Sequence, residues 1–127
     1  RTPVVNVTIT ATVKYSRHMT RVISTTDFNN WINKLKDLRS KQRIIRRLDR
    51  LADGNPGDVR PVGGGVSELR MPFGPGYRVY YLKEGSTLIL LLCGGDKSSQ
   101  QQDIDQAQTL ATKWRTEQGK RDSNDGE

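Results

Sequence analysis

An uninterrupted apolar segment at residues 87–92 organises this 127-residue chain. A turn sequence, Glu84-Gly85-Ser86, comes before the segment, and a loop sequence at residues 94–97 follows it. A strand with one face in water alternates apolar and polar residues, whereas a strand covered on both faces is apolar throughout. The segment therefore predicts a central β-strand that is buried on both faces.

The rest of the core pattern predicts both helices and strands. Shorter alternating segments predict three more strands, at residues 21–24, 66–71 and 77–83. Apolar residues at helical spacing predict three helices, over residues 28–35, 44–52 and 104–114. Helices and strands are segregated along the chain, which is typical of the α+β class. We therefore expect a small antiparallel sheet packed on an N-terminal pair of antiparallel helices, with a C-terminal helix.

The two ends of the chain differ from its centre. Residues 1–18 alternate apolar and polar side chains, and His18-Met19 is a common cloning junction. We expect Met19 to be the natural start and residues 1–18 to be an upstream or cloning-derived extension; the alternative is a native strand that covers a sheet edge. Residues 118–127 are polar and are expected to form a mobile tail, which leaves residues 19–117 as the domain.

The charge of the chain favours an anionic partner. Its 21 Lys and Arg residues against 14 Asp and Glu give a net charge of +7, which indicates RNA or DNA. Cys93 is the single cysteine and His18 the single histidine, which excludes a multi-cysteine zinc site and a histidine metal cluster within one chain. No metal or organic cofactor is suggested. The lone cysteine fits a reducing compartment. No apolar run reaches the roughly 18 residues of a membrane helix, so no membrane partner is expected.

Four polar residues are predicted to share one face of the sheet. Glu68 and Arg70 alternate with apolar residues in one strand, and Arg78 and Tyr80 do so in the next. With an odd-length loop at residues 72–76, Arg70 lies opposite Arg78 and Glu68 opposite Tyr80. Neighbouring arginines repel each other unless an anion or a carboxylate such as Glu68 joins them. The alternative is an ordinary solvated face whose ion pairs contribute little to stability.

The loop after the central strand contains Lys97, Ser98 and Ser99 directly before the last helix. Backbone N–H groups and serine hydroxyls at a helix N-terminus favour a phosphate, and Lys97 adds a positive charge. Ser98 and Ser99 are therefore candidates for RNA binding. The alternative interpretation is a turn with a capping serine.

Four segments in order carry a family resemblance: residues 53–58 (DGNPGD), 65–70 (GVSELR), 74–81 (GPGYRVYY) and 91–100 (LLCGGDKSSQ). Together they resemble the RelE/ParE toxin superfamily, and most closely its HigB-like addiction module killer branch. Phe28 and Trp31 in the first helix also fit this branch. The resemblance covers roughly Met19 to Trp114 and implies a RelE-like fold.

The resemblance implies a toxin of a type II toxin–antitoxin system. Members like RelE and HigB are ribosome-dependent endoribonucleases, or mRNA interferases, and inhibit translation, so the resemblance implies this activity here. The implied partners are a cognate antitoxin, typically a small helix-turn-helix protein, together with the ribosome and mRNA. The expected location is the cytoplasm, for a protein of bacterial or phage-derived origin. Arg78 matches a phosphate-contacting arginine of the family, while Arg70 and Lys97 match basic positions. Some members use a histidine or tyrosine near the chain end, but here no histidine follows His18 and no tyrosine follows Tyr81.

Cleavage of RNA by its own 2′-OH needs a base, positive charge near the phosphorane, and an acid. Arg70 and Arg78 are candidates to hold the scissile phosphate. Lys97 is a candidate to stabilise charge or to act as the acid. Glu68 and Tyr80 are candidates for the base, and Tyr80 could instead stack a nucleobase.

The second predicted helix is strongly basic and offers a surface for the ribosomal RNA backbone. Its candidate RNA-binding residues are Lys41, Arg43, Arg46, Arg47 and Arg50. The alternative for this surface is a solvated helix face.

For the whole protein, two alternatives to the nuclease stay open. One is a ParE-like inhibitor of DNA gyrase that catalyses nothing, and the other is a plain RNA-binding domain.

Overall fold

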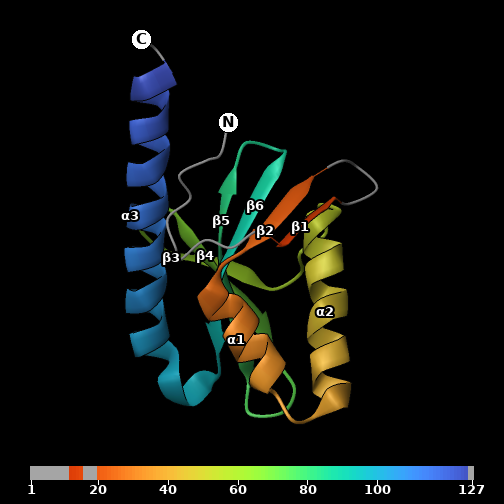
Figure 1. Cartoon of the computed structure of the whole chain (residues 1–127). Helices are drawn as coiled ribbons and strands as arrows, with labels where there is room; N and C mark the ends of the chain where they lie inside the picture. Colours follow the sequence, from red (N-terminus) through yellow and green to blue (C-terminus); the bar gives the residue numbers. More distant parts are fainter. Residues whose placement is uncertain (1–11, 16–19, 126–127) are drawn as a thin grey trace.

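The computed structural model describes residues 12–15 and 20–125, with side chains from residue 20 to residue 119. A sheet lies between two helices on one face and one long helix on the other (Figure 1). The elements in chain order are β1 (Thr12–Tyr15), β2 (Arg21–Ser24), α1 (Thr26–Lys34), α2 (Leu38–Ala52), β3 (Val59–Gly63), β4 (Val66–Met71), β5 (Tyr77–Glu84), β6 (Leu88–Gly95), the 3-10 turn η1 (Lys97–Ser99) and α3 (Gln100–Asp125). The helix α2 runs opposite to α1, as expected for the helix pair (Figure 1). The described residues therefore form an α+β fold, as predicted.

Six strands form one sheet in the order β1-β2-β6-β5-β4-β3. The strands β3 to β6 form an antiparallel meander. The expectation of a purely antiparallel sheet is wrong at one step, because β2 pairs with β6 in parallel, with Ile23 beside Leu90. β2 and β6 are not joined by a hairpin: after β2 the chain passes through both helices and re-enters the sheet at the opposite edge, as β3.

The two edge strands of the sheet were not among the predicted core strands. At one edge, β3 contains Pro61, which cannot donate a ladder hydrogen bond and is tolerated only because the position is an edge. At the other edge, β1 pairs antiparallel with β2, with Val13 opposite Ile23. This is the place that the native-strand alternative assigned to the N-terminal segment. The His18-Met19 junction lies outside the described residues.

The central strand β6 is covered on both faces, as the apolar segment predicts. Leu90 and Leu92 belong to a core that includes Trp114 of α3. Ile89 and Leu91 belong to a second core, formed with residues of α1 and α2. Successive residues of a strand point to opposite faces, so an unbroken apolar strand supplies side chains to two cores at once.

Two boundaries differ from the expected ones. Gly94 and Gly95 pair with Val79 and Arg78 as the last residues of β6, whereas their sequence predicts a loop. The helix α3 continues through Asp125, past the expected domain end at residue 117.

Candidate functional site

Polar residues of β4 and β5 lie on the sheet face that α3 covers. Arg70 lies opposite Arg78 and Glu68 lies opposite Tyr80, which confirms the register predicted from an odd-length loop. Val66, which shares this face by alternation, belongs to the core under α3. Glu68 and Tyr80 are each 0% exposed, so the alternative of an ordinary solvated face does not hold for them. The predicted cluster exists, but half of it is inside the protein.

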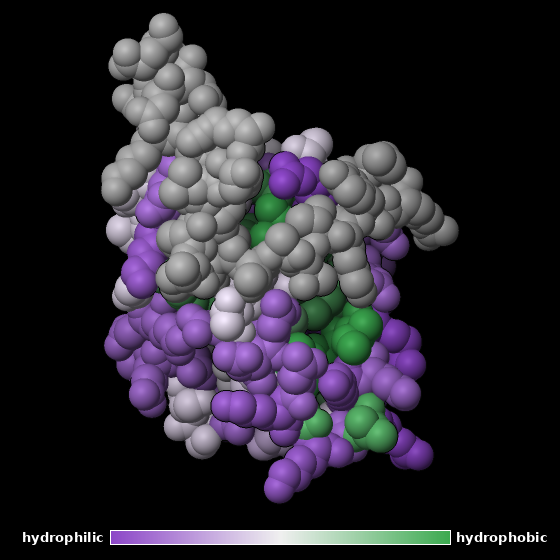
Figure 2. Space-filling model, viewed as in Figure 1, coloured by the Kyte–Doolittle hydropathy of each residue, from purple (hydrophilic) through white to green (hydrophobic). Residues whose placement is uncertain are grey.

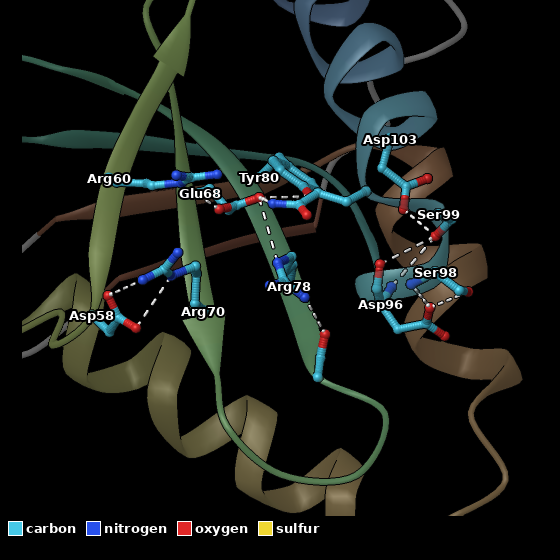
Figure 3. A network of polar contacts seen from close by, with 12 residues as sticks. Asp58, Arg60, Glu68, Arg70, Arg78, Tyr80, Asp96, Ser98, Ser99 and Asp103 are labelled. Carbon is cyan, nitrogen blue, oxygen red and sulfur yellow. Dashed lines mark hydrogen bonds and ion pairs between the residues drawn. The ribbon is translucent and has the colours of Figure 1, made fainter.

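Glu68 is the centre of this cluster (Figure 3). Its carboxylate accepts hydrogen bonds from Arg60 Nε at 3.1 Å, Tyr80 OH at 3.0 Å and Gln100 Nε2 at 2.9 Å. Arg78 Nε lies 3.6 Å from Glu68 Oε2, an ion-pair distance. Groups from β3, β4, β5 and α3 thus meet at one buried carboxylate.

The surroundings of Glu68 fix the protonation of two groups. Burial by itself raises the pKa of Glu68, but hydrogen bonds from Gln100, Tyr80 and Arg60 outweigh it and leave the pKa below its ordinary value. Burial, and then the hydrogen bond to Glu68, raises the pKa of Tyr80 far above the ordinary value for a tyrosine. Glu68 is therefore an ionised, enclosed acceptor and Tyr80 a neutral donor. Neither is placed to take a proton from a substrate or to stack a nucleobase.

Arg78 is held from two sides. Its Nη1 donates to the carbonyl oxygen of Gly76 at 2.8 Å, and its side chain is 12% exposed. A Cβ at Gly76 would lie 3.3 Å from Arg78 Nη1 and 3.4 Å from Lys97 Cβ, and the φ of Gly76 is +81°. The backbone N–H of Lys97 also donates to Pro75 O at 3.4 Å. The structure thus brings Arg78 and the exposed Lys97 to the same loop.

Arg70 has a carboxylate of its own. Its Nε and Nη2 donate to the two carboxylate oxygens of Asp58, at 3.2 and 3.4 Å. The two side chains are 36% and 55% exposed. Asp58 was missed in the sequence analysis, although it ends the DGNPGD segment, because the strand β3 that follows it was not predicted. The backbone bond from Arg70 N to Asp58 O places the two residues side by side.

The loop before α3 uses its anion-binding groups on the protein's own carboxylates. Asp96 accepts from the backbone N–H of Ser98 at 2.8 Å and from the Ser98 hydroxyl. The Ser99 hydroxyl donates to Asp103. Hydrogen bonds from Ser98 lower the pKa of Asp96, so this cap is ionised. The local structure is a capped turn, as in the alternative interpretation, with an aspartate as the cap.

The basic residues of α2 do not form one surface. Arg47 donates from Nη1 to Arg70 O at 3.3 Å and from Nη2 to Pro56 O at 2.9 Å, so it ties α2 to the sheet. Arg43 lies over the Phe73 ring, 3.9 Å from its centroid. Arg46 and Arg50 are exposed, and Lys41 is half-buried. Arg47 is thus a structural residue, while the others remain on or near the surface.

The same helix exposes apolar surface. Leu38 is 67% and Ile45 is 38% exposed, and Figure 2 shows apolar surface among polar side chains on the side of α2.

Within the described ranges, no helix is both long and apolar enough to cross a membrane. The same residues contain no cluster of three or more His, Cys, Asp or Glu side chains that could hold a metal ion.

The structure is a small basic α+β protein whose sheet lies between two cores and carries an arginine–carboxylate cluster on one face. Residues 30–114 match the phage-derived Gp49-like protein family (DUF891). An uncharacterised protein of Haemophilus influenzae is 51% identical over 94 residues, or 73% of this chain and 95% of that protein. The chain belongs to the Gp49-like family, a RelE/Gp49-type toxin family associated with toxin–antitoxin systems.

Proposed function

We propose that this protein is the toxin of a type II toxin–antitoxin system of the HigB-like branch, and that it cleaves mRNA on the ribosome. The observation that carries the proposal is the placement of Arg78. Its guanidinium is anchored by Glu68 and Gly76, it stands beside the exposed Lys97, and Arg70 lies across from it on the next strand. Three cations near one loop suit a phosphate of a nucleic acid.

In this proposal the basic groups carry the catalysis. Arg78 and Lys97 bind the scissile phosphate and stabilise the charge that develops on the phosphorane, which is usually the largest single contribution. Arg70 exchanges its exposed partner Asp58 for a substrate phosphate. Glu68 and Tyr80 are not the base, because both are buried and saturated with protein contacts. The ribosome supplies the orientation of the 2′-OH and phosphate, which is worth about 7–11 kcal/mol in well-ordered reactions.

Primer extension on a defined mRNA in a reconstituted translation system tests this proposal. We expect cuts that need ribosomes with the wild-type protein, none with Arg78→Ala, and a rate about tenfold or more lower with Lys97→Ala. Lys113→Ala is the matched control, since Lys113 is an exposed lysine of α3 with no place in the cluster. Thermal unfolding establishes that each variant is folded. Intact mRNA in every lane, with growth arrest in cells, would reject the nuclease.

A specific observation also favours a second function, a ParE-like inhibitor of DNA gyrase. The exposed Leu38 and Ile45 on α2 suit a protein partner better than RNA, and the carboxylate and phenol of the cluster are enclosed. Such an inhibitor arrests DNA supercoiling and leaves mRNA intact. Substitution of Leu38 by Ser would then relieve toxicity, whereas a nuclease acting through Arg78 would retain it.

A further inference from the structure

Glu68 is a completely buried carboxylate between two arginines, one on each neighbouring strand. We infer that Glu68 is a positioning residue: it fixes the Arg78 guanidinium so that its free nitrogen faces a phosphoryl oxygen of the substrate. This inference rests on the proposed nucleic-acid site, and it assigns Glu68 a role other than proton transfer.

The contacts of Arg78 support an oriented side chain. Nη1 donates to Gly76 O at 2.8 Å, and Nε lies 3.6 Å from Glu68 Oε2. Arg78 Nε is buried and has no hydrogen-bond acceptor among the described residues, so the charge of Glu68 is what compensates it. Within the same part of the chain no acceptor contacts Nη2. Two of the three guanidinium nitrogens are therefore occupied from the protein side, and Nη2 is left for a ligand.

The contacts of Glu68 explain why it can serve as a fixed anchor. Arg60, Tyr80 and Gln100 come from three different elements and hold both carboxylate oxygens. Such a group cannot rotate toward a substrate without breaking buried hydrogen bonds, each of which is costly to lose. The two arginines exceed the one carboxylate in charge, so the cluster keeps a positive excess that attracts phosphate.

The opposite role, in which Glu68 masks Arg78 from anions, makes the opposite prediction. A masking carboxylate competes with phosphate for the guanidinium, and neutralising it strengthens anion binding. A positioning carboxylate lowers the entropic cost of binding, and neutralising it weakens anion binding although a negative charge is lost. The sign of the change therefore decides between the two roles.

The test uses the full chain without ribosomes and a 2′-O-methyl oligouridylate, which cannot be cleaved. We expect E68Q to bind this probe about tenfold more weakly than wild type by fluorescence anisotropy. The ¹⁵N–¹H signal of Arg78 Nε should be sharp in the wild type and broadened or lost in E68Q. Glu84→Gln is the matched control, because Glu84 is an exposed carboxylate of β5 outside the cluster and loses the same charge; it should change affinity by less than about twofold.

Unchanged or tighter binding by E68Q, with an unchanged Nε signal, would overturn the positioning role. If E68Q does not fold, Arg78→Lys replaces it. Lysine keeps the charge but cannot occupy Glu68 and Gly76 together, so equal binding by this variant would also overturn the inference. The Nε signal is independent of turnover: an ordered Arg78 that needs Glu68, in a protein that never cuts mRNA on ribosomes, supports the positioning role and rejects the nuclease.

Discussion

Arg70 and Arg78 lie directly opposite each other on β4 and β5, yet their guanidinium groups are matched to different carboxylates. Arg70 pairs with Asp58 at the surface, and Arg78 pairs with Glu68 in the interior. This separation removes the repulsion between two like charges on adjacent strands. In the proposed function, the exposed Arg70 exchanges its partner for an incoming anion, and the buried Arg78 stays in place.

The exposed pair gives the first prediction. In Asp58→Asn, Arg70 loses its competing carboxylate, so the affinity for oligouridylate should rise by about two- to fivefold at low salt. Stability should change by less than about 1 kcal/mol, because the ion pair is exposed. Asp49→Asn, an exposed acid on α2, is the control with the same charge change. Fluorescence anisotropy at two salt concentrations measures the effect, and weaker binding by Asp58→Asn would contradict the prediction.

Arg47 and Arg46 are neighbours on α2 with different expected effects on stability. Arg47→Ala leaves the carbonyl oxygens of Arg70 and Pro56 without their donor, and it should lower the free energy of unfolding by about 1–3 kcal/mol. Arg46→Ala removes an exposed side chain and should change it by less than about 0.5 kcal/mol. Urea unfolding compares the two. Equal effects would show that the Arg47 contacts do not stabilise the fold.

The buried carboxylate predicts a pH dependence of stability. The pKa of Glu68 is lower in the folded chain than its ordinary value of 4.5, so its ionised form adds stability above that pH. The contribution is lost as the pH falls below about 4.5 and through the folded pKa. Asp37 and Asp96 also have lowered pKa values, but both are retained in E68Q. The melting temperature of wild type should therefore fall toward that of E68Q on acidification; a constant difference would contradict this.

Two glycines differ in the space available for a side chain, and their alanine variants form a matched pair. A Cβ at Gly94 would overlap the Trp31 ring, so Gly94→Ala should lower the free energy of unfolding by about 1–3 kcal/mol through overpacking. Gly119 in α3 has open space around it, so Gly119→Ala should stabilise the helix by up to about 1 kcal/mol. Thermal unfolding measures both variants. A tolerated Gly94→Ala would mean that Trp31 is free to move.

Much of the candidate site could be predicted from the sequence. The alternation of Glu68 and Arg70 with apolar residues, and of Arg78 and Tyr80 in the next strand, predicted the observed register through the parity of the loop. The burial of Glu68 and Tyr80 could not be predicted in the same way. Polar residues at alternating positions indicate a solvated face unless another element covers that face. The sequences of β4 and β5 do not show that α3 packs on it.

The sequence by itself determined the helices, the core strands, the doubly buried β6 and the pairing of Arg70 with Arg78. These features follow from periodicity within a segment, because backbone geometry sets which side chains share a face. Only the tertiary structure decided the parallel pairing of β2 with β6, the edge position of β3 and the enclosure of Glu68. These depend on contacts between segments far apart in the chain, whose free energy no local pattern records.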